Sequence, residues 1–280
     1  MELITVAYFF AVIIGLGYSF AQLMKLDKFN DPIEKAIFLI GLGLVAFVLV
    51  SIPLSIFHNL VWYNFLIIAM LLPIYHLCKK RYKEEILLLR IPKEYIIVGL
   101  VTVLLFCVYL AGAFSYSYLE DADPWEHSKA AKYVSIYHTY YQPDHLPFHY
   151  LEPYPPFYST FMGVLHQLHF ESIQWTLKFF NVLLIAFSLP FAYIWLRKFT
   201  KSEKVAVMST FLLASLPSFM SHFIWAQTLS LLLWFPALYS IEKLKEEKNK
   251  RWLTAASLVI ATILITQPST AFIFGIFFIF

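Results

Sequence analysis

Residues 1–20, MELITVAYFFAVIIGLGYSF, decide the class of fold, because they hold a single acidic residue, Glu2, and no basic residue. The run is long enough to cross a bilayer as a helix, which needs about 20 predominantly apolar residues. A secretory signal peptide would begin with a positively charged segment and end at a small-residue cleavage site, and this run has neither. The chain therefore begins with a predicted membrane-spanning helix.

The composition of the whole chain agrees with this start. The chain has 280 residues, of which 60% are hydrophobic and 14% charged, whereas a soluble domain is about 45–50% apolar and about 25% charged. We therefore expect an all-α, polytopic transmembrane helical protein, surrounded by a lipid bilayer and without a nucleic-acid partner. Cys78 and Cys107 lie in or beside apolar runs, which argues against a structural disulfide and a cysteine metal site.

Apolar runs predict about nine spanning segments and two units. The runs are roughly 3–24, 36–57, 60–77, 95–115, 176–196, 205–221, 223–241, 252–267 and 270–280. The last run stops without a polar flank, so we expect the chain to be the N-terminal part of a longer protein. Residues 1–94 are expected to form an accessory three-helix transmembrane unit, and residues 95–280 an incomplete core that contains the long connection 116–175.

Lysine and arginine residues predict the orientation. The connections 25–35, 78–94, 197–204 and 242–251 hold three, six, four and five of the 21 Lys and Arg residues. The alternating segments hold the other three, which are Lys129, Lys132 and Lys178. Because short basic connections stay in the cytoplasm, we expect a multi-pass plasma-membrane protein with an external N-terminus. The connection 116–175 then also lies outside, and a connection of this length is usually functional.

The external connection opens with a cluster of carboxylates, in LEDADPWEHSKAAKYV (residues 119–134). Asp123, Pro124 and Glu126 fit an N-cap, a first helical position and a capping box, so a helix from Asp123 to about Tyr137 is one interpretation. Capping leaves Asp121 beside it without a role. Crowded carboxylates also provide a general base or part of a divalent-metal site. Both interpretations of Asp123 remain open at this point.

Cations and aromatic residues follow the carboxylates. His127, Lys129 and Lys132 suit a substrate that carries phosphate, although solvation alone also explains the lysines. The stretch after Pro156 predicts a helix of about 14 residues, too short to span, lying in the interface plane. Its aromatic residues form either a membrane belt or a wall that faces sugar or lipid. The histidines show no spacing typical of a zinc site.

The segment DPWEHSKAAKYV resembles the first external-loop motif of the catalytic subunit of oligosaccharyltransferases, which are membrane glycosyltransferases of the GT-C superfamily. The residues in register are Asp123, Pro124, Trp125, His127, Lys129, Ala130, Lys132, Tyr133 and Val134. YPPFYSTFMGVL, which begins at Tyr154, is similar to a segment that follows this loop in many GT-C enzymes. FIWAQTLSLLL and TQPSTAF are similar to other GT-C segments, and the resemblance covers roughly residues 95–280.

The resemblance implies a glycosyltransferase. Its donor would be a sugar or glycan linked to polyprenyl or dolichyl phosphate, and its acceptor a glycan, lipid or protein at the external face. Asp123 would activate the acceptor or hold a divalent cation such as Mg²⁺ or Mn²⁺, with Asp121 as its helper. Tyr154 would bind substrate. The next external loop, LPSFMSHFIWAQTLS, lacks the acidic residue that oligosaccharyltransferases carry there, and His222 and Gln227 are its most evident polar groups.

Two other functions compete with this one. A transporter with an acidic external mouth should have charged or broken helices near the membrane centre. The predicted spans have almost no ionisable residue at their centres, which favours chemistry at the surface. A non-catalytic membrane scaffold is the third possibility, and the missing second acidic motif is compatible with it.

Overall fold

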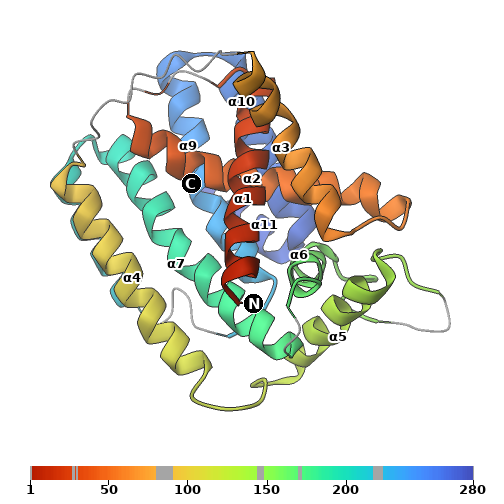
Figure 1. The fold of residues 1–280 in the computed structure, drawn as a ribbon. Coiled ribbons are helices and arrows are strands. Elements are labelled where there is room, and N and C mark those ends of the chain that lie inside the picture. The colour runs from red at the N-terminus through yellow and green to blue at the C-terminus, as the bar shows by residue number, and fades with distance from the viewer. Residues whose placement is uncertain are drawn as a thin grey trace.

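The protein is all-α, as the sequence predicts. The computed structural model describes residues 2–26, 29, 31–79, 91–143, 148–169, 172–216 and 223–279. These residues form eleven helices and no strand (Figure 1). In chain order the helices are α1 (Glu2–Leu23), α2 (Pro32–Ile56), α3 (Trp62–Cys78), α4 (Lys93–Ala113), α5 (Ala122–Tyr137), α6 (Phe157–His166), α7 (Ile173–Thr200), α8 (Glu203–Ser215), α9 (Gln227–Glu247), α10 (Lys250–Thr266) and α11 (Pro268–Ile279).

Four of these helices, α1, α2, α4 and α7, are long and apolar enough to cross a membrane. They support a multi-pass membrane protein, but the nine spans expected from the apolar runs reduce to four among the described residues. The reason is that several apolar runs break early. Helix α8 has 13 residues and rises only about 20 Å, short of the hydrocarbon thickness of about 30 Å, and α3 and α10 have 17 residues each.

Helices α1 and α2 form a tightly packed pair. A Cβ atom added at Gly17 would collide with the carbonyl oxygen of Leu39, and one added at Gly43 would collide with that of Ile13. Because glycine has no Cβ, the two backbones approach closely at both positions. Small residues at helix crossings are a general means of close packing in membranes.

Helix α7 lies in the middle of the bundle and packs against α4, α8 and α9 (Figure 1). Aromatic residues join it to the N-terminal helices. The ring of Phe9 on α1 lies 6.0 Å from that of Phe161 on α6 and 5.6 Å from that of Phe180 on α7. All three side chains are buried. The expected unit 1–94 therefore shares a hydrophobic core with the residues that follow it.

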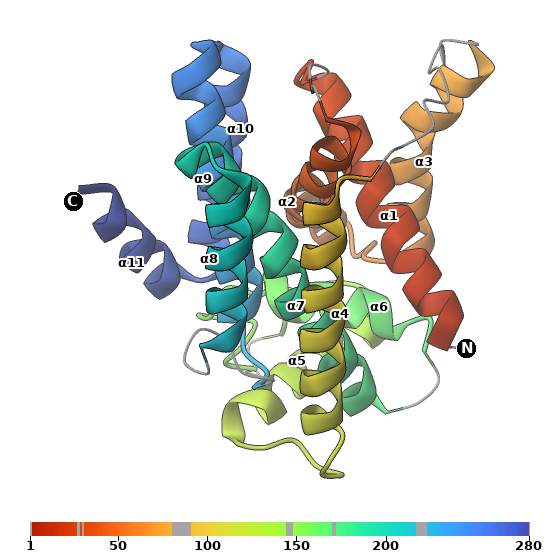
Figure 2. The same ribbon diagram turned by 90° about the vertical axis from the view of Figure 1, so that its left-hand side faces the viewer.

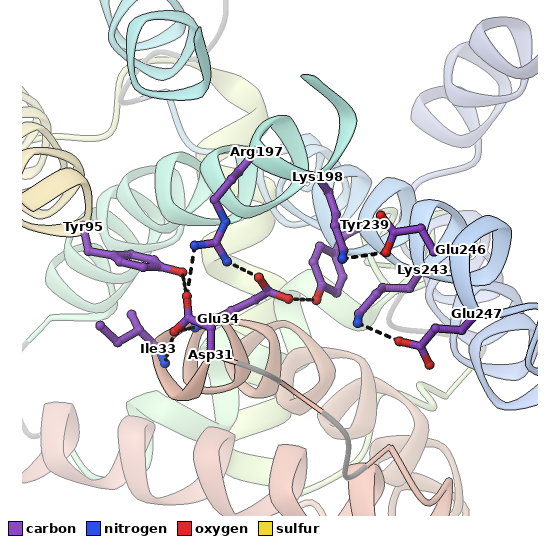
Figure 3. A network of polar contacts seen from close by, with 10 residues as sticks. All are labelled: Asp31, Ile33, Glu34, Tyr95, Arg197, Lys198, Tyr239, Lys243, Glu246 and Glu247. Carbon is purple, nitrogen blue, oxygen red and sulfur yellow. Dashed lines mark hydrogen bonds and ion pairs between the residues drawn. The ribbon is translucent and has the colours of Figure 1, made fainter. Parts of the chain in front are cut away.

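A polar network also connects the two expected units (Figure 3). Asp31 caps α2, with Pro32 at its first position as the sequence predicts, and its Oδ1 accepts a hydrogen bond from the backbone N–H of Ile33 at 2.9 Å. Arg197 of α7 contacts Asp31 Oδ2 at 2.9 Å and also Glu34. The figure further shows the Tyr95 and Tyr239 hydroxyl groups donating to Asp31 and Glu34. Four helices, α2, α4, α7 and α9, meet in this network.

Basic residues gather at the same end of the bundle. Lys198 forms an ion pair with Glu246 at 2.6 Å, and Figure 3 shows this pair beside the network. Arg251 donates to the backbone carbonyl oxygen of Lys25 at 3.0 Å. Described parts of three basic connections therefore lie together at one end of the bundle. In Figure 2, α5 and α6 lie at the opposite end of the bundle.

Helix α6 differs from its prediction. It has 10 residues, not about 14, and every one of them is buried, so the helix is internal and does not rest on the membrane interface. The cause is its packing against α5. A Cβ atom at Gly163 would lie 2.6 Å from the backbone oxygen of Ala131, so the two helices touch at this glycine.

Candidate functional site

The carboxylates at the start of α5 have different roles from those that the motif suggests. Asp121 is the N-cap, with extended backbone (φ −152°), and its Oδ1 accepts a hydrogen bond from the Ala122 N–H at 2.7 Å. Asp123 lies in the first turn, so its predicted N-cap role is wrong. The predicted capping box is wrong too, because Glu126 pairs with Lys129 at 2.6 Å. Asp favours either position, so local sequence preferences do not separate the two residues.

Asp123 is held by a tyrosine from the loop before α6. The hydroxyl group of Tyr150 donates to Asp123 Oδ1 at 2.5 Å. The Tyr150 ring stacks on that of Tyr154, with centroids 4.6 Å apart and an interplanar angle of 25°. Tyr154 in turn accepts a hydrogen bond from Gln267 at 2.7 Å. The result is an exposed carboxylate beside a pair of stacked aromatic rings.

Burial and contact with Asp123 change the acidity of these tyrosines. Burial raises the pKa of Tyr150, and the hydrogen bond to Asp123 raises it further. Burial and the charge of Asp123 raise the pKa of Tyr154 to about 12. Both hydroxyl groups are therefore protonated at neutral pH and act as hydrogen-bond donors or weak acceptors.

His127 packs edge-to-face against the stacked tyrosines. Its ring is 4.4 Å from that of Tyr150 and 4.9 Å from that of Tyr158, and Nδ1 is 3.1 Å from the hydroxyl oxygen of Ser159. The side chain is 1% exposed, and burial lowers the pKa of His127 to about 3. The ring is therefore neutral, and the expectation that His127 offers a cation to phosphate does not fit its position.

The two lysines of α5 point to different partners. Lys129, whose side chain is 55% exposed, contacts Glu126 across one turn. The Nζ of Lys132 lies 3.2 Å from Nε2 of His166, whose Nδ1 is 3.1 Å from the hydroxyl oxygen of Thr176. Burial and the nearby charge of Lys132 lower the pKa of His166 to about 4. The contacts of Lys132 with His166, and of His166 with Thr176, therefore help to hold α5 against α6 and α7.

Helices from distant parts of the sequence meet behind the tyrosines. Tyr158 donates to Asn181 of α7 at 2.8 Å, and Asn181 donates to the backbone oxygen of Phe223 at 3.0 Å. The segment before α9 is thereby joined to the site. Gln227, a predicted substrate-binding residue, begins α9, whereas His222 lies outside the described residues.

Several polar atoms in this interior have no hydrogen-bond partner within the described part of the chain. They are His127 Nε2, Gln227 Oε1 and the hydroxyl oxygens of Thr160, Thr228, Ser230 and Thr266. Most buried polar groups in proteins are paired, so unpaired ones call for an explanation, such as strain, bound water or a function. The polar atoms from α5, α6, α9 and α10 therefore mark this end of the bundle as a candidate site.

The predicted divalent cation would have few protein ligands here. Within the described ranges, no group of three or more His, Cys, Asp or Glu side chains is placed to hold a metal ion. Asp121 and Asp123 each use Oδ1 in a hydrogen bond and keep a second oxygen. Mg²⁺ commonly binds to one or two carboxylates and completes its coordination with substrate phosphates and water. The two aspartates fit only a cation of that kind.

Sequence reasoning singled out Asp123, His127 and Tyr154 but missed Tyr150 and Gln267. The tyrosines at 150, 154 and 158 recur every four residues, which is a signal that could have been used. Comparison of the chain with protein-family models, with curated proteins and with solved structures finds no match. What the fold and the site define is therefore a class: a helical membrane protein with a carboxylate–tyrosine site at one end.

Proposed function

We propose that the protein is a GT-C type glycosyltransferase. It takes a sugar from a polyprenyl- or dolichyl-phosphate-linked donor and transfers it to a glycan, lipid or protein acceptor at the external face of the plasma membrane. The observation that carries the proposal is the setting of Asp123. This carboxylate is exposed, held by Tyr150 at 2.5 Å and flanked by stacked tyrosine rings, in a segment that resembles the first external loop of oligosaccharyltransferases.

The chemistry assigned to Asp123 is general base catalysis. As the acceptor oxygen or nitrogen attacks the anomeric carbon of the donor sugar, its proton moves to the free carboxylate oxygen of Asp123. The bond between the anomeric carbon and the phosphate oxygen breaks, and the lipid phosphate leaves with that electron pair. Tyr150 fixes the carboxylate for this transfer. A positioned base supplies about 10²–10⁴-fold.

The stacked rings of Tyr150 and Tyr154 provide a surface for the apolar face of a sugar. Lys129 and Lys132 are exposed on the same helix and suit oxygen atoms of the substrate. A divalent cation between Asp121, Asp123 and the donor phosphate would add charge stabilisation. Asp121 would otherwise hold the start of α5, and thereby the position of Asp123.

The positions of charged residues favour this function over transport. In the four long helices, Glu2, Glu34, Lys35, Lys93, Glu94, Arg197 and Lys198 lie in the first or last turns, and Lys178 lies in the second turn of α7. A transport path for ions or polar solutes usually places ionisable groups near the membrane centre. The ion pairs and hydrogen-bonded carboxylates described above lie at the two ends of the bundle.

The deciding experiment replaces Asp123 by Asn in the whole chain. Asn keeps the size and hydrogen bonding of the side chain but cannot accept the proton. Release of polyprenyl phosphate from a polyprenyl-phosphate-linked hexose should fall at least about a hundredfold, the lower end of the range for a general base. The matched control is Glu152→Gln, an exposed carboxylate of the same loop. Near-normal release by both Asp123→Asn and Asp121→Asn would contradict the proposal.

A further inference from the structure

An apolar groove lies between α4 and α7, at the end of the bundle that carries α5. Its volume is about 540 Å³, and it is lined by Cys107, Leu110, Ala111, Phe114, Trp175 and Phe179. Figure 1 shows α4 beside α7 at one edge of the molecule. The residues on the outer side of α4 are largely exposed, such as Leu104 at 62% and Val108 at 57%. In a membrane, the groove would therefore open toward the lipid.

The wall of the groove that α7 provides is an aromatic stack. The Trp175 ring lies 4.8 Å from that of Phe179 and 4.2 Å from the imidazole of His169, with interplanar angles of 8° and 7°. Flat, rigid rings give a smooth apolar surface at little cost in conformational entropy. Such a surface suits an extended hydrocarbon chain.

A cation lies beside the groove. Lys178 belongs to the same helix as Trp175 and Phe179, and its side chain is 3% exposed. Its Nζ lies 5.6 Å from the centroid of the Phe114 ring, which lines the groove, and 4.0 Å from that of Tyr116. It donates to the backbone oxygen of Tyr116 at 2.6 Å. This bond uses one of the three N–H donors of the ammonium group, and the carboxylate of Glu120 supplies a nearby negative charge that a bound phosphate would share.

Lys178 also connects the groove with the carboxylate site. Tyr116, its hydrogen-bond partner, lies in the connection that leads from α4 to Asp121 and the start of α5. Lys178 is one of the three lysines outside the basic connections, and the other two, Lys129 and Lys132, are on α5. Because Lys178 lies in the second turn of α7, it places its charge at the same end of the bundle as these two lysines.

From the groove, the aromatic wall and this cation together, we propose that the groove binds the lipid of a polyprenyl phosphate, with the isoprenoid chain between α4 and α7 and the phosphate at Lys178. This inference rests on the proposed function for the identity of the lipid. It assigns the donor an entry from the membrane on one side of the bundle, and it makes Lys178 a binding residue. The leaving lipid phosphate would depart by the same groove.

The two cysteines of the chain provide the test. Cys107 lines the groove, and Cys78, at the end of α3, is also exposed and does not line it. Purified protein in nanodiscs is treated with a membrane-soluble maleimide, and labelling of each cysteine is followed by mass spectrometry. Undecaprenyl phosphate should slow the labelling of Cys107 and leave that of Cys78 unchanged.

The phosphate contact is tested by comparing lipids on the unmodified protein. Undecaprenyl phosphate should protect Cys107 at a concentration about tenfold lower than undecaprenol does, since one charge-assisted contact is worth about that factor. Phosphatidic acid carries the same phosphate on two acyl chains, and it should protect less well than undecaprenyl phosphate. Equal protection by all three lipids would mean that the groove binds any membrane lipid, and would overturn the proposal.

Variants of Lys178 separate binding from packing. Lys178→Met should remove the advantage of the phosphate over the alcohol, and Lys178→Arg should keep it, while Lys204→Met at the other end of the bundle should change nothing. Loss of the advantage in Lys178→Arg as well would contradict a role for the charge. Asp123→Asn should leave protection intact. If undecaprenyl phosphate protects Cys107 but Asp123→Asn keeps its transfer activity, only the catalytic assignment is refuted. If Asp123→Asn is inactive but undecaprenyl phosphate does not protect Cys107, only the groove is refuted.

Discussion

In the network of Figure 3, the charged side chains pair with one another, and Asp31 and Glu34 also accept from tyrosine hydroxyl groups, whereas at the end that carries α5 the polar groups are only partly used. Arg197 contacts Asp31 and Glu34, and each of these carboxylates also accepts from a tyrosine. At the opposite end, Asp123 has one tyrosine partner and remains exposed, and Nε2 of the buried His127 has no partner among the described residues.

The difference suggests different roles for the two ends. A network whose opposite charges pair with one another joins helices and leaves little net charge to attract a ligand. An exposed carboxylate above unpaired polar atoms retains that capacity, and such groups are common at functional sites. We therefore expect substitutions at the first end to change stability and substitutions at the second end to change activity.

The largest change in stability is expected for Arg197→Met, which leaves Asp31 and Glu34 without their cation. Removing one partner of a buried pair typically costs 3–5 kcal/mol, and because these side chains are 9–24% exposed we expect about 3 kcal/mol, the lower end of that range. Lys129→Met, at an exposed ion pair, should cost less than about 1 kcal/mol. Thermal unfolding in detergent compares the two. Similar losses from both variants would contradict the contrast between the ends.

Mild acid should weaken the α5 end. Burial holds the pKa of His127 at about 3, below its ordinary 6.5, so at pH 5 the unfolded chain carries a proton there that the folded chain excludes. Stability therefore falls as the pH is lowered from 7 to 5, by about 2 kcal/mol for this group. His127→Gln should remove that part of the pH dependence, leaving the part due to His166.

The control for the acid effect is His149→Gln, since His149 is exposed in the neighbouring loop. This variant should keep the full pH dependence. Unfolding by denaturant at pH 7 and pH 5 measures the difference. An unchanged dependence in His127→Gln would place the acid-sensitive group elsewhere.

The smallest expected effect separates the two aspartates. Asp121→Ala should cost about 1 kcal/mol through loss of the N-cap, and Asp121→Asn almost nothing, because Asn is an equally good cap. Asp123→Ala should cost less stability than Asp121→Ala. Helix protection in amide hydrogen exchange over α5 reports the change locally. The reverse order of the two alanine variants would return the cap to Asp123, as the motif first suggested.

Local chemistry explains what the sequence predicted well. The start of α2 at Asp31 and Pro32 follows from cap preferences that act within a few residues. The end of α5 at Tyr137 also agrees with its prediction. The choice between Asp121 and Asp123 did not follow, since both are good caps. Hydropathy predicted the apolar runs but not where they break, as α8 does after Ser215.

Contacts between distant residues were beyond prediction from local patterns. Arg197 meets Asp31 across 166 residues, and Tyr154 meets Gln267 across 113. Each depends on how several helices pack together, which no single segment encodes. The carboxylate of the candidate site was identified from its motif, whereas the tyrosine that holds it comes from a loop whose path depends on the whole fold.

The close contact of α1 and α2 at Gly17 and Gly43 has a consequence for biogenesis. Both helices leave the ribosome before any later element, and their glycines let them pair without a partner from the rest of the chain. The paired α1 and α2 would then already lie in the membrane, with Glu34 and Phe9 available for the packing of α6, α7 and α9. Replacing either glycine by a larger residue would disturb this pairing, and with it the later assembly of the candidate site.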